Sequence, residues 1–274
     1  MRIFLNSNFM KFYRSRFYLF CILTICIWNE VYSQTKDLTL QEDKFVNSYS
    51  KLYNLDRGND SIAYYSERFG KAFTSFIKAN PSTLTYAFKK LTERHYCQVT
   101  TSYDGNFRVY SWDTQTGGTM HYFNQIYQYR TNEKVFIKIP NYGKDDAGVF
   151  CSKIYAVTIK NKVYYLAISN GIYSSKNASQ SISVFTIDNN KLVDTVKLFR
   201  TKTKLLNSID VNFDFFNVVD RPERLLELIT YDDKHKIIYI SVVNNKGQVT
   251  AKKILYQLKG SYFEFIGIET AQRK

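Results

Sequence analysis

Ser111, Asp113 and His121 are the residues whose types and spacing come closest to a hydrolytic site in this sequence. A serine becomes a nucleophile when a histidine accepts its proton and a carboxylate orients that histidine. A nucleophilic serine is usually presented on a strained turn such as G-x-S-x-G, and the sequence lacks that motif. We therefore expect a polar cluster at a strand end, with catalysis by these three side chains as the alternative.

A hairpin is expected to bring these side chains to one face. Asp104-Gly105 is typical of a tight turn, and a second, five-residue turn is expected over 114–118. With that turn, Ser111 faces His121 across the two strands. Because alternate residues of a strand share a face, Asp113 joins them there.

The opposite face of the same hairpin carries aromatic side chains beside a cation. Its members are Arg108, Tyr110, Trp112 and Tyr122. Flat rings with a donor nearby can stack on a sugar ring or an aromatic group. We take these four residues as the candidate ligand-binding site, although a cross-strand aromatic ladder packed in the core is the competing interpretation.

Residues 104–121 form the pattern D-G-x-x-R-x-Y-S-W-D-x-x-x-G-G-T-M-H. This segment resembles part of a group of exported proteins of Gram-negative bacteria that have no assigned activity. The general layout of a leader, helices and then strands is similar as well. The resemblance implies export, and it assigns a role to no residue.

The N-terminus predicts a secretory signal peptide over residues 1–33. Lys11, Arg14 and Arg16 form a basic leader, and Phe17 to Trp28 is a run without charge. That run is shorter than the ~20 residues that a membrane span needs. We expect cleavage near Gln34 and a mature chain that is periplasmic, secreted or at the cell surface, with no membrane span. An uncleaved anchoring helix is the alternative.

Composition favours a folded, strand-rich protein with a basic surface. Aromatic residues make up 17% of the chain, and the net charge is +14. Loss of the leader removes four basic residues and one acidic residue, which lowers the net charge to +11. Many lysines fall in short polar turns, where they keep strand edges soluble. The expected partner is an unidentified envelope component, such as an anionic polysaccharide or another exported protein, and not nucleic acid.

Two further sets of residues could bind metal or form a bond. Cys97 and Cys151 remain after the leader is removed, and a disulfide and two buried free thiols are both open. Asp210, Asn212 and Asp214 alternate along one expected strand and form a weak calcium candidate, because the glycine and closing glutamate of a calcium loop are missing. No dinucleotide or phosphate-binding motif occurs, so no cofactor is expected.

Periodicity divides the chain into a helical part, 34–95, and a β part, 96–274. Apolar spacing predicts helices over about 42–55, over 61–79, and from about Ser82 onward. After residue 96 the period changes to two, with Asn, Asp, Gly and Lys in the turns. The strands are expected near 96–103, 106–112, 119–129, 134–139, 150–159, 162–169, 181–188, 191–199, 209–217, 225–231, 236–243, 248–258 and 261–268.

The expected fold is α+β. Two or three N-terminal helices pack on a long antiparallel meander, arranged as a sandwich, a barrel or propeller-like blades in one compact unit. The expected function is that of a non-enzymatic binding or interaction protein of the bacterial cell envelope. The alternative is a hydrolase of envelope glycan or peptide with His121 as its base.

Overall fold

The computed structural model describes residues 37–56, 58–132, 134–143, 146–220 and 226–270. From Phe45 onward the described chain forms one compact unit. The expected signal peptide, residues 1–33, lies outside the described residues. Within the described ranges, no helix has both the length and the apolar character that crossing a bilayer demands.

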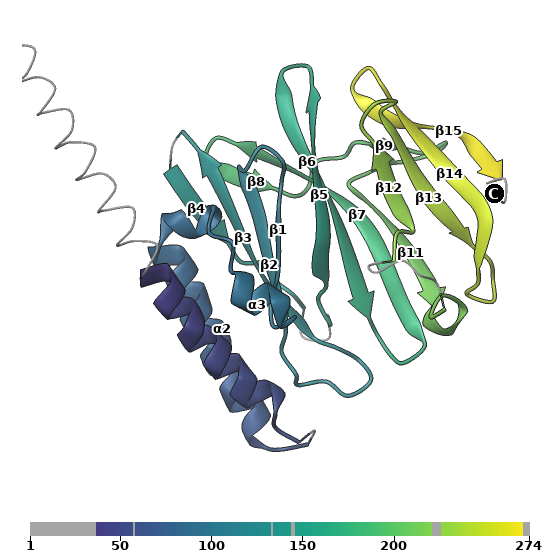
Figure 1. Ribbon diagram of the computed structural model, residues 1–274. Coiled ribbons are helices and arrows are strands. Elements are labelled where there is room, and N and C mark those ends of the chain that lie inside the picture. Colours follow the sequence, from purple (N-terminus) through teal and green to yellow (C-terminus); the bar gives the residue numbers. More distant parts are fainter. Residues whose placement is uncertain (1–36, 57, 133, 144–145, 221–225, 271–274) are drawn as a thin grey trace, which may run out of the picture. The chain divides into compact units, whose positions relative to one another are not determined.

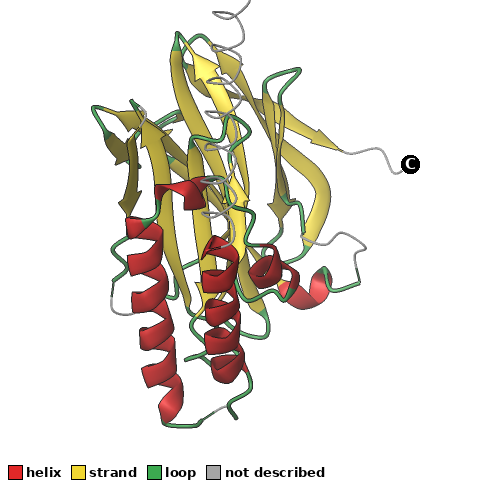
Figure 2. Cartoon of the chain, turned by 60° about the vertical axis from the view of Figure 1, so that its left-hand side comes forward, coloured by secondary structure: helices red, strands yellow, loops and turns green. Residues whose placement is uncertain are grey.

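The structure is rich in antiparallel strands and has a few helices near the start of the described chain, in agreement with an α+β fold (Figures 1 and 2). A helix covers residues 37–53. The other helical elements are α2 (Ser61–Ala79), the 3-10 turn η1 (Pro81–Leu84), α3 (Lys89–Glu93) and the 3-10 turn η2 (Phe215–Asn217).

The first sheet is a four-stranded antiparallel meander in the order β1-β2-β3-β4. Its strands are β1 (Gln98–Thr101), β2 (Phe107–Asp113), β3 (Phe123–Thr131) and β4 (Lys134–Lys138). Helix α2 covers one face of this sheet. A cluster of buried side chains from α2, β2 and β3 forms their shared core.

The second sheet has the order β11-β7-β6-β5, and β8 pairs with the end of β7. Its strands are β5 (Phe150–Ile159), β6 (Lys162–Ile172), β7 (Asn177–Asp188), β8 (Lys191–Val193) and β11 (Ser208–Asp214). A second buried cluster, with Phe107 of β2 and Tyr165 of β6, packs this sheet against the first.

The third sheet has the order β10-β9-β15-β14-β13-β12. Its strands are β9 (Phe199–Arg200), β10 (Leu205–Leu206), β12 (Ile229–Asp232), β13 (Ile237–Val243), β14 (Val249–Lys259) and β15 (Tyr262–Thr270). Its pairs are antiparallel except β15 with β9, which are parallel and depart from the expected meander. The largest buried cluster lies between this sheet and the second one.

Helix α2 forms where the apolar stripe predicts it. Ile62, Phe69, Phe73 and Ile77 are buried, at spacings of one or two helical turns. The helix ends at Ala79 and is capped by Asn80, whose side-chain amide donates to the carbonyl of Phe76 at 2.8 Å. Pro81 follows, which favours an end of the helix here.

The helix expected from Ser82 onward is broken into two short pieces, η1 and α3. Phe88, which lies between them, has a left-handed backbone with φ at 49°. This conformation buries its ring completely against Phe73 and Tyr110. Tertiary packing of one aromatic ring therefore overrides local helix propensity here.

Candidate functional site

The turn that follows β2 is longer than the sequence predicts, so the expected register is wrong. Asp113 pairs with Phe123, and Ser111 pairs with Gln125. The connection covers residues 114–122 because its second half bonds elsewhere. The backbone N–H of His121 donates to the carbonyl of Ile172 on β6 at 3.0 Å.

His121 and Asp113 nevertheless meet. The Nδ1 atom of His121 lies 2.5 Å from Oδ2 of Asp113. The other carboxylate oxygen accepts the backbone N–H of Gln115 at 2.8 Å, and the carbonyl of Asp113 accepts the hydroxyl of Tyr49 at 2.7 Å. The imidazole is half-buried and stacks on Phe123. This is a histidine held and oriented by a carboxylate.

Ser111 takes no part in that pair. Its Oγ accepts hydrogen bonds from Nε2 of Gln125 and from the backbone N–H of Cys151, each at 3.1 Å. The side chain is buried between two sheets. No hydrogen bond joins Ser111 to His121 in the part of the chain that the structure describes. The catalytic alternative that uses Ser111 as nucleophile is therefore not assembled.

The aromatic face of β2 is core and not a binding platform. Tyr110 is fully buried and Trp112 is 3% exposed, because α2 and η1 cover them. Arg108 is buried too, and it donates to the carbonyls of Thr83 and Tyr86. Burial raises the pKa of Tyr110 to about 12.

Tyr122, the fourth member of the expected platform, lies in the turn after β2 and is half-buried. It pairs with no residue of β2 in the sheet register, in which Phe123 is the first partner. The four residues therefore do not share one exposed face.

Cys97 and Cys151 are buried free thiols, so the disulfide alternative is not realised. Cys97 belongs to the cluster under the helices, and Cys151 belongs to the cluster between the first two sheets. Burial raises the pKa of each thiol to about 12. Neither thiol is an activated nucleophile, because that role requires a lowered pKa.

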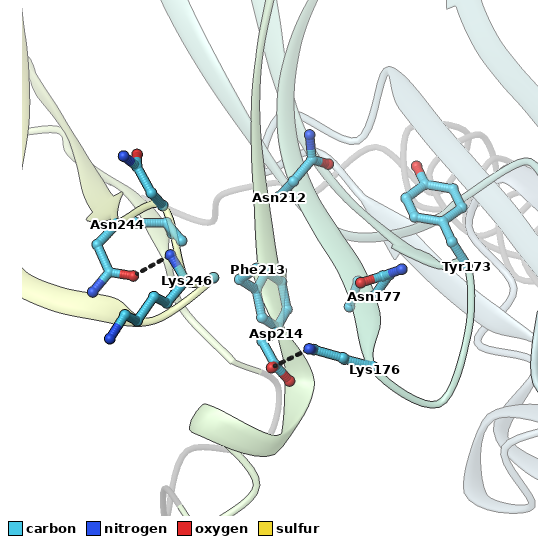
Figure 3. A pocket seen from close by; sticks show the side chains of 12 residues that line it. Tyr173, Lys176, Asn177, Asn212, Phe213, Asp214, Asn244 and Lys246 are labelled. Carbon is cyan, nitrogen blue, oxygen red and sulfur yellow. Dashed lines mark hydrogen bonds and ion pairs between the residues drawn. The ribbon is translucent and has the colours of Figure 1, made fainter.

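A polar pocket of about 660 Å³ lies where the ends of β7 and β11 face the β13–β14 turn (Figure 3). We call it the asparagine pocket. Tyr173 and Lys176 from the β6–β7 turn contribute to its wall. Its other polar side chains are Asn177, Asn212, Asp214, Asn244, Asn245 and Lys246.

Several hydrogen-bonding groups of the asparagine pocket are unused. The side-chain amides of Asn177, Asn212 and Asn245 make no hydrogen bond to another described residue, although the backbone of Asn177 does. Asp214 and Lys176 partly neutralise each other, with 3.5 Å between carboxylate and ammonium. The groups of the pocket that are open to a ligand are therefore the neutral side-chain amides, each a donor and an acceptor of hydrogen bonds. The ammonium of Lys246 is open as well, because it has no ion-pair partner among the described residues.

The β13–β14 turn is fixed against β11 by backbone contacts. The N–H of Asp214 donates to the carbonyl of Gly247 at 2.9 Å. Gly247 has φ at +76°, and a Cβ there would lie 2.9 Å from Cβ of Asp214. Only glycine fits this contact without displacement. Oδ1 of Asn244 accepts the N–H groups of Lys246 and Gln248, which shapes the turn.

The weak calcium candidate falls on β11 as expected, with Val211 and Phe213 buried between its members. Asn212 and Asp214 line the asparagine pocket, whereas Asp210 does not. The Oδ1 atom of Asp214 already accepts the N–H of Phe216, and its other oxygen faces Lys176. The described residues contain no group of three or more His, Cys, Asp or Glu side chains suited to a metal ion.

Two signals for the asparagine pocket were present in the sequence. One was the alternation of polar residues on β11, and the other was the Asn244-Asn245-Lys246 turn. Nothing in either segment indicates that they meet across two sheets. Chemically, their groups can bind hydroxyl-rich ligands, while the His121–Asp113 pair can accept a proton. No protein-family model matches this chain, and a search of curated proteins finds no relative.

Proposed function

We propose that this chain is an exported, non-enzymatic binding protein of the bacterial cell envelope, and that its ligand is a glycan held in the asparagine pocket. One observation carries the proposal: three amide side chains without a bonding partner among the described residues line the same pocket of about 660 Å³. That volume is within the ~300–1,000 Å³ of typical ligand sites.

The chemistry of the pocket supports a sugar over other small ligands. An amide presents a donor and an acceptor side by side, which suits the adjacent hydroxyls of a sugar ring. Tyr173 contributes a ring to the wall of the same pocket (Figure 3). The pocket is fixed by strand ends and a backbone-anchored turn, so a ligand meets groups that are already positioned.

Binding is tested with the purified mature chain on a glycan array, followed by calorimetry on the glycans retained. Asn177→Ala and Asn212→Ala should each weaken binding by about twofold to tenfold, because one neutral hydrogen bond contributes about 0.5–1.5 kcal/mol. The matched control is Asn124→Ala, an exposed asparagine on β3 outside the pocket. Retention of no glycan, or equal binding by all variants, would overturn the proposal.

Export is tested separately by N-terminal sequencing of the protein recovered from a cell-envelope fraction. We expect the mature chain to begin near Gln34. The basic leader and the uncharged run support this expectation, as does the resemblance of residues 104–121 to a segment of exported proteins. A chain that is retained in the cytoplasm, or one that begins with a lipidated Cys26, would contradict it.

The His121–Asp113 pair favours one second candidate, a hydrolase of envelope glycan or peptide. A histidine oriented through Nδ1 can use Nε2 to take a proton from a water molecule. Incubation of the protein with isolated envelope peptidoglycan, followed by assays for new reducing ends and amines, tests this candidate. Product that disappears in His121→Gln but not in Asn124→Ala would favour the hydrolase over the binding protein.

A further inference from the structure

A second pocket adjoins the asparagine pocket and has the opposite character. It has a volume of about 640 Å³, and we call it the apolar pocket. The two pockets share Ala178 and Phe213 in their walls. Its apolar lining includes Phe150, Ile172, Phe213, Phe215, Val219 and Leu226.

The apolar pocket leaves large hydrophobic side chains in contact with water. Phe215 is 45% exposed and Val219 is 46% exposed. Phe216, next to the pocket, is also exposed. Apolar area that is kept together in a concave site, and not scattered, is typical of a binding surface, because an apolar occupant removes it from water.

Tyr173 lines the asparagine pocket and contacts a residue of the apolar pocket. Its ring lines the asparagine pocket, while its hydroxyl lies 3.0 Å from Oγ of Ser179, a residue that lines the apolar pocket. The ring takes this position because residue 171 is glycine. A Cβ at Gly171 would lie 2.6 Å from the hydroxyl of Tyr173 and 2.9 Å from Oγ of Ser179.

We propose that the ligand is an amphiphile whose polar head lies in the asparagine pocket and whose single alkyl chain lies in the apolar pocket. The inference rests on the proposed glycan-binding function and deepens it. The shared walls at Ala178 and Phe213 allow one molecule to contact both pockets. The chemistry that the two pockets would recognise together is that of a sugar joined to a hydrocarbon chain.

The test uses n-alkyl β-maltosides of increasing chain length, each below its critical micelle concentration, with maltose as the chain-free reference. Calorimetry on the whole mature chain should show affinity rising with chain length. The rise should approach about tenfold for every two methylenes that are fully buried, at about 0.8 kcal/mol each. The rise should end when the chain exceeds the pocket.

Two variants assign that rise to the apolar pocket. Phe215→Ser and Val219→Ser should each flatten the dependence on chain length, and either serves if the other fails to fold. Ile268→Ser is the matched control, because Ile268 is 59% exposed on β15 and lines neither pocket. An equal dependence on chain length in all three variants would overturn the inference.

The outcomes separate this inference from the proposed function. Binding that Asn212→Ala weakens, with no dependence on chain length, supports the glycan site and overturns the amphiphile. A dependence on chain length that Asn212→Ala leaves unchanged shows that no head is held in the asparagine pocket, and it overturns one ligand spanning both pockets. Dimerisation that Phe215→Ser abolishes, without alkyl maltoside binding, also overturns the inference, because a second copy would then cover the apolar surface.

Discussion

Trp112 meets Phe73 edge to face, with 5.7 Å between the ring centroids and 88° between the planes. Phe69 approaches the same indole at 5.8 Å and 74°. Phe69 and Phe73 are one turn apart on α2, so the indole lies against two successive positions of its apolar stripe. This contact packs α2 against β2, the strand that carries most residues of the expected polar cluster and of the expected ligand-binding site.

Replacing Trp112 by alanine should therefore destabilise the fold strongly. We expect the free energy of unfolding to fall by about 3–5 kcal/mol, since the change leaves a cavity under α2. Urea unfolding followed by circular dichroism measures it. Tyr103→Ala is the aromatic control, because Tyr103 is fully exposed and its removal should change little. A small loss for Trp112→Ala would contradict its assignment to the core.

The sequence could place α2 and most strands, because their periodicity is local. It could not decide which face of β2 is covered. Successive side chains of β2 point to opposite faces as expected, but both faces are buried, one under α2 and the other against the second sheet. Arg108 favours an exposed face in the sequence, since arginine is rarely buried. In the structure it is buried, and its guanidinium donates hydrogen bonds to two backbone carbonyls.

The other differences between expectation and structure depend on contacts between segments that are far apart in the sequence. The sequence predicts a five-residue turn over 114–118, whereas the bond of His121 to Ile172 on another sheet goes with a longer connection over 114–122. The asparagine pocket depends on a contact between β11 and the β13–β14 turn. Period and turn chemistry describe each segment alone, so they do not indicate which segments will meet.

Ser111 and His121 should respond differently to substitution by alanine. Ser111→Ala leaves the buried donors of Gln125 and Cys151 without their acceptor, at about 1–3 kcal/mol for each donor. His121→Ala removes a half-buried ring and should cost about 1 kcal/mol. Thermal melts of the two variants give the comparison. The reverse order of stability would contradict a structural role for Ser111.

Stability should fall at alkaline pH because burial raises the pKa of several thiol and phenol groups, among them Cys97, Cys151 and Tyr110. The pKa of each of the two thiols, Cys97 and Cys151, rises from 9.0 to about 12. The pKa of the Tyr110 hydroxyl rises from 10.0 to about 12. In the unfolded chain these groups lose their protons at lower pH than in the folded protein. Their contribution is therefore complete below pH 9 and is lost as the pH rises from 9 to about 12.

Urea midpoints measured from pH 8 to pH 11 test this dependence. Cys97→Ala removes one of these groups, so its midpoint should fall less steeply above pH 9 than that of the unmodified protein. His235→Ala serves as the control, because His235 lies in an exposed turn and should leave the alkaline slope unchanged. Parallel curves for the unmodified protein and Cys97→Ala would contradict the proposed cause.

A comparison of Gly247→Ala with Gly260→Ala separates the free-energy cost of backbone strain from the cost of close packing at the asparagine pocket. Both have a positive φ, +76° and +60°, so alanine at either position should cost about 1–2 kcal/mol of strain. At Gly260 a Cβ meets nothing within 4 Å, whereas at Gly247 it lies 2.9 Å from Cβ and 3.1 Å from the backbone nitrogen of Asp214. Gly247→Ala should therefore cost more stability than Gly260→Ala. It should also weaken glycan binding, because the β13–β14 turn must move away from β11. Urea unfolding and calorimetry on both variants provide the comparison, and equal losses of stability and binding would show that the contact with Asp214 does not fix the pocket.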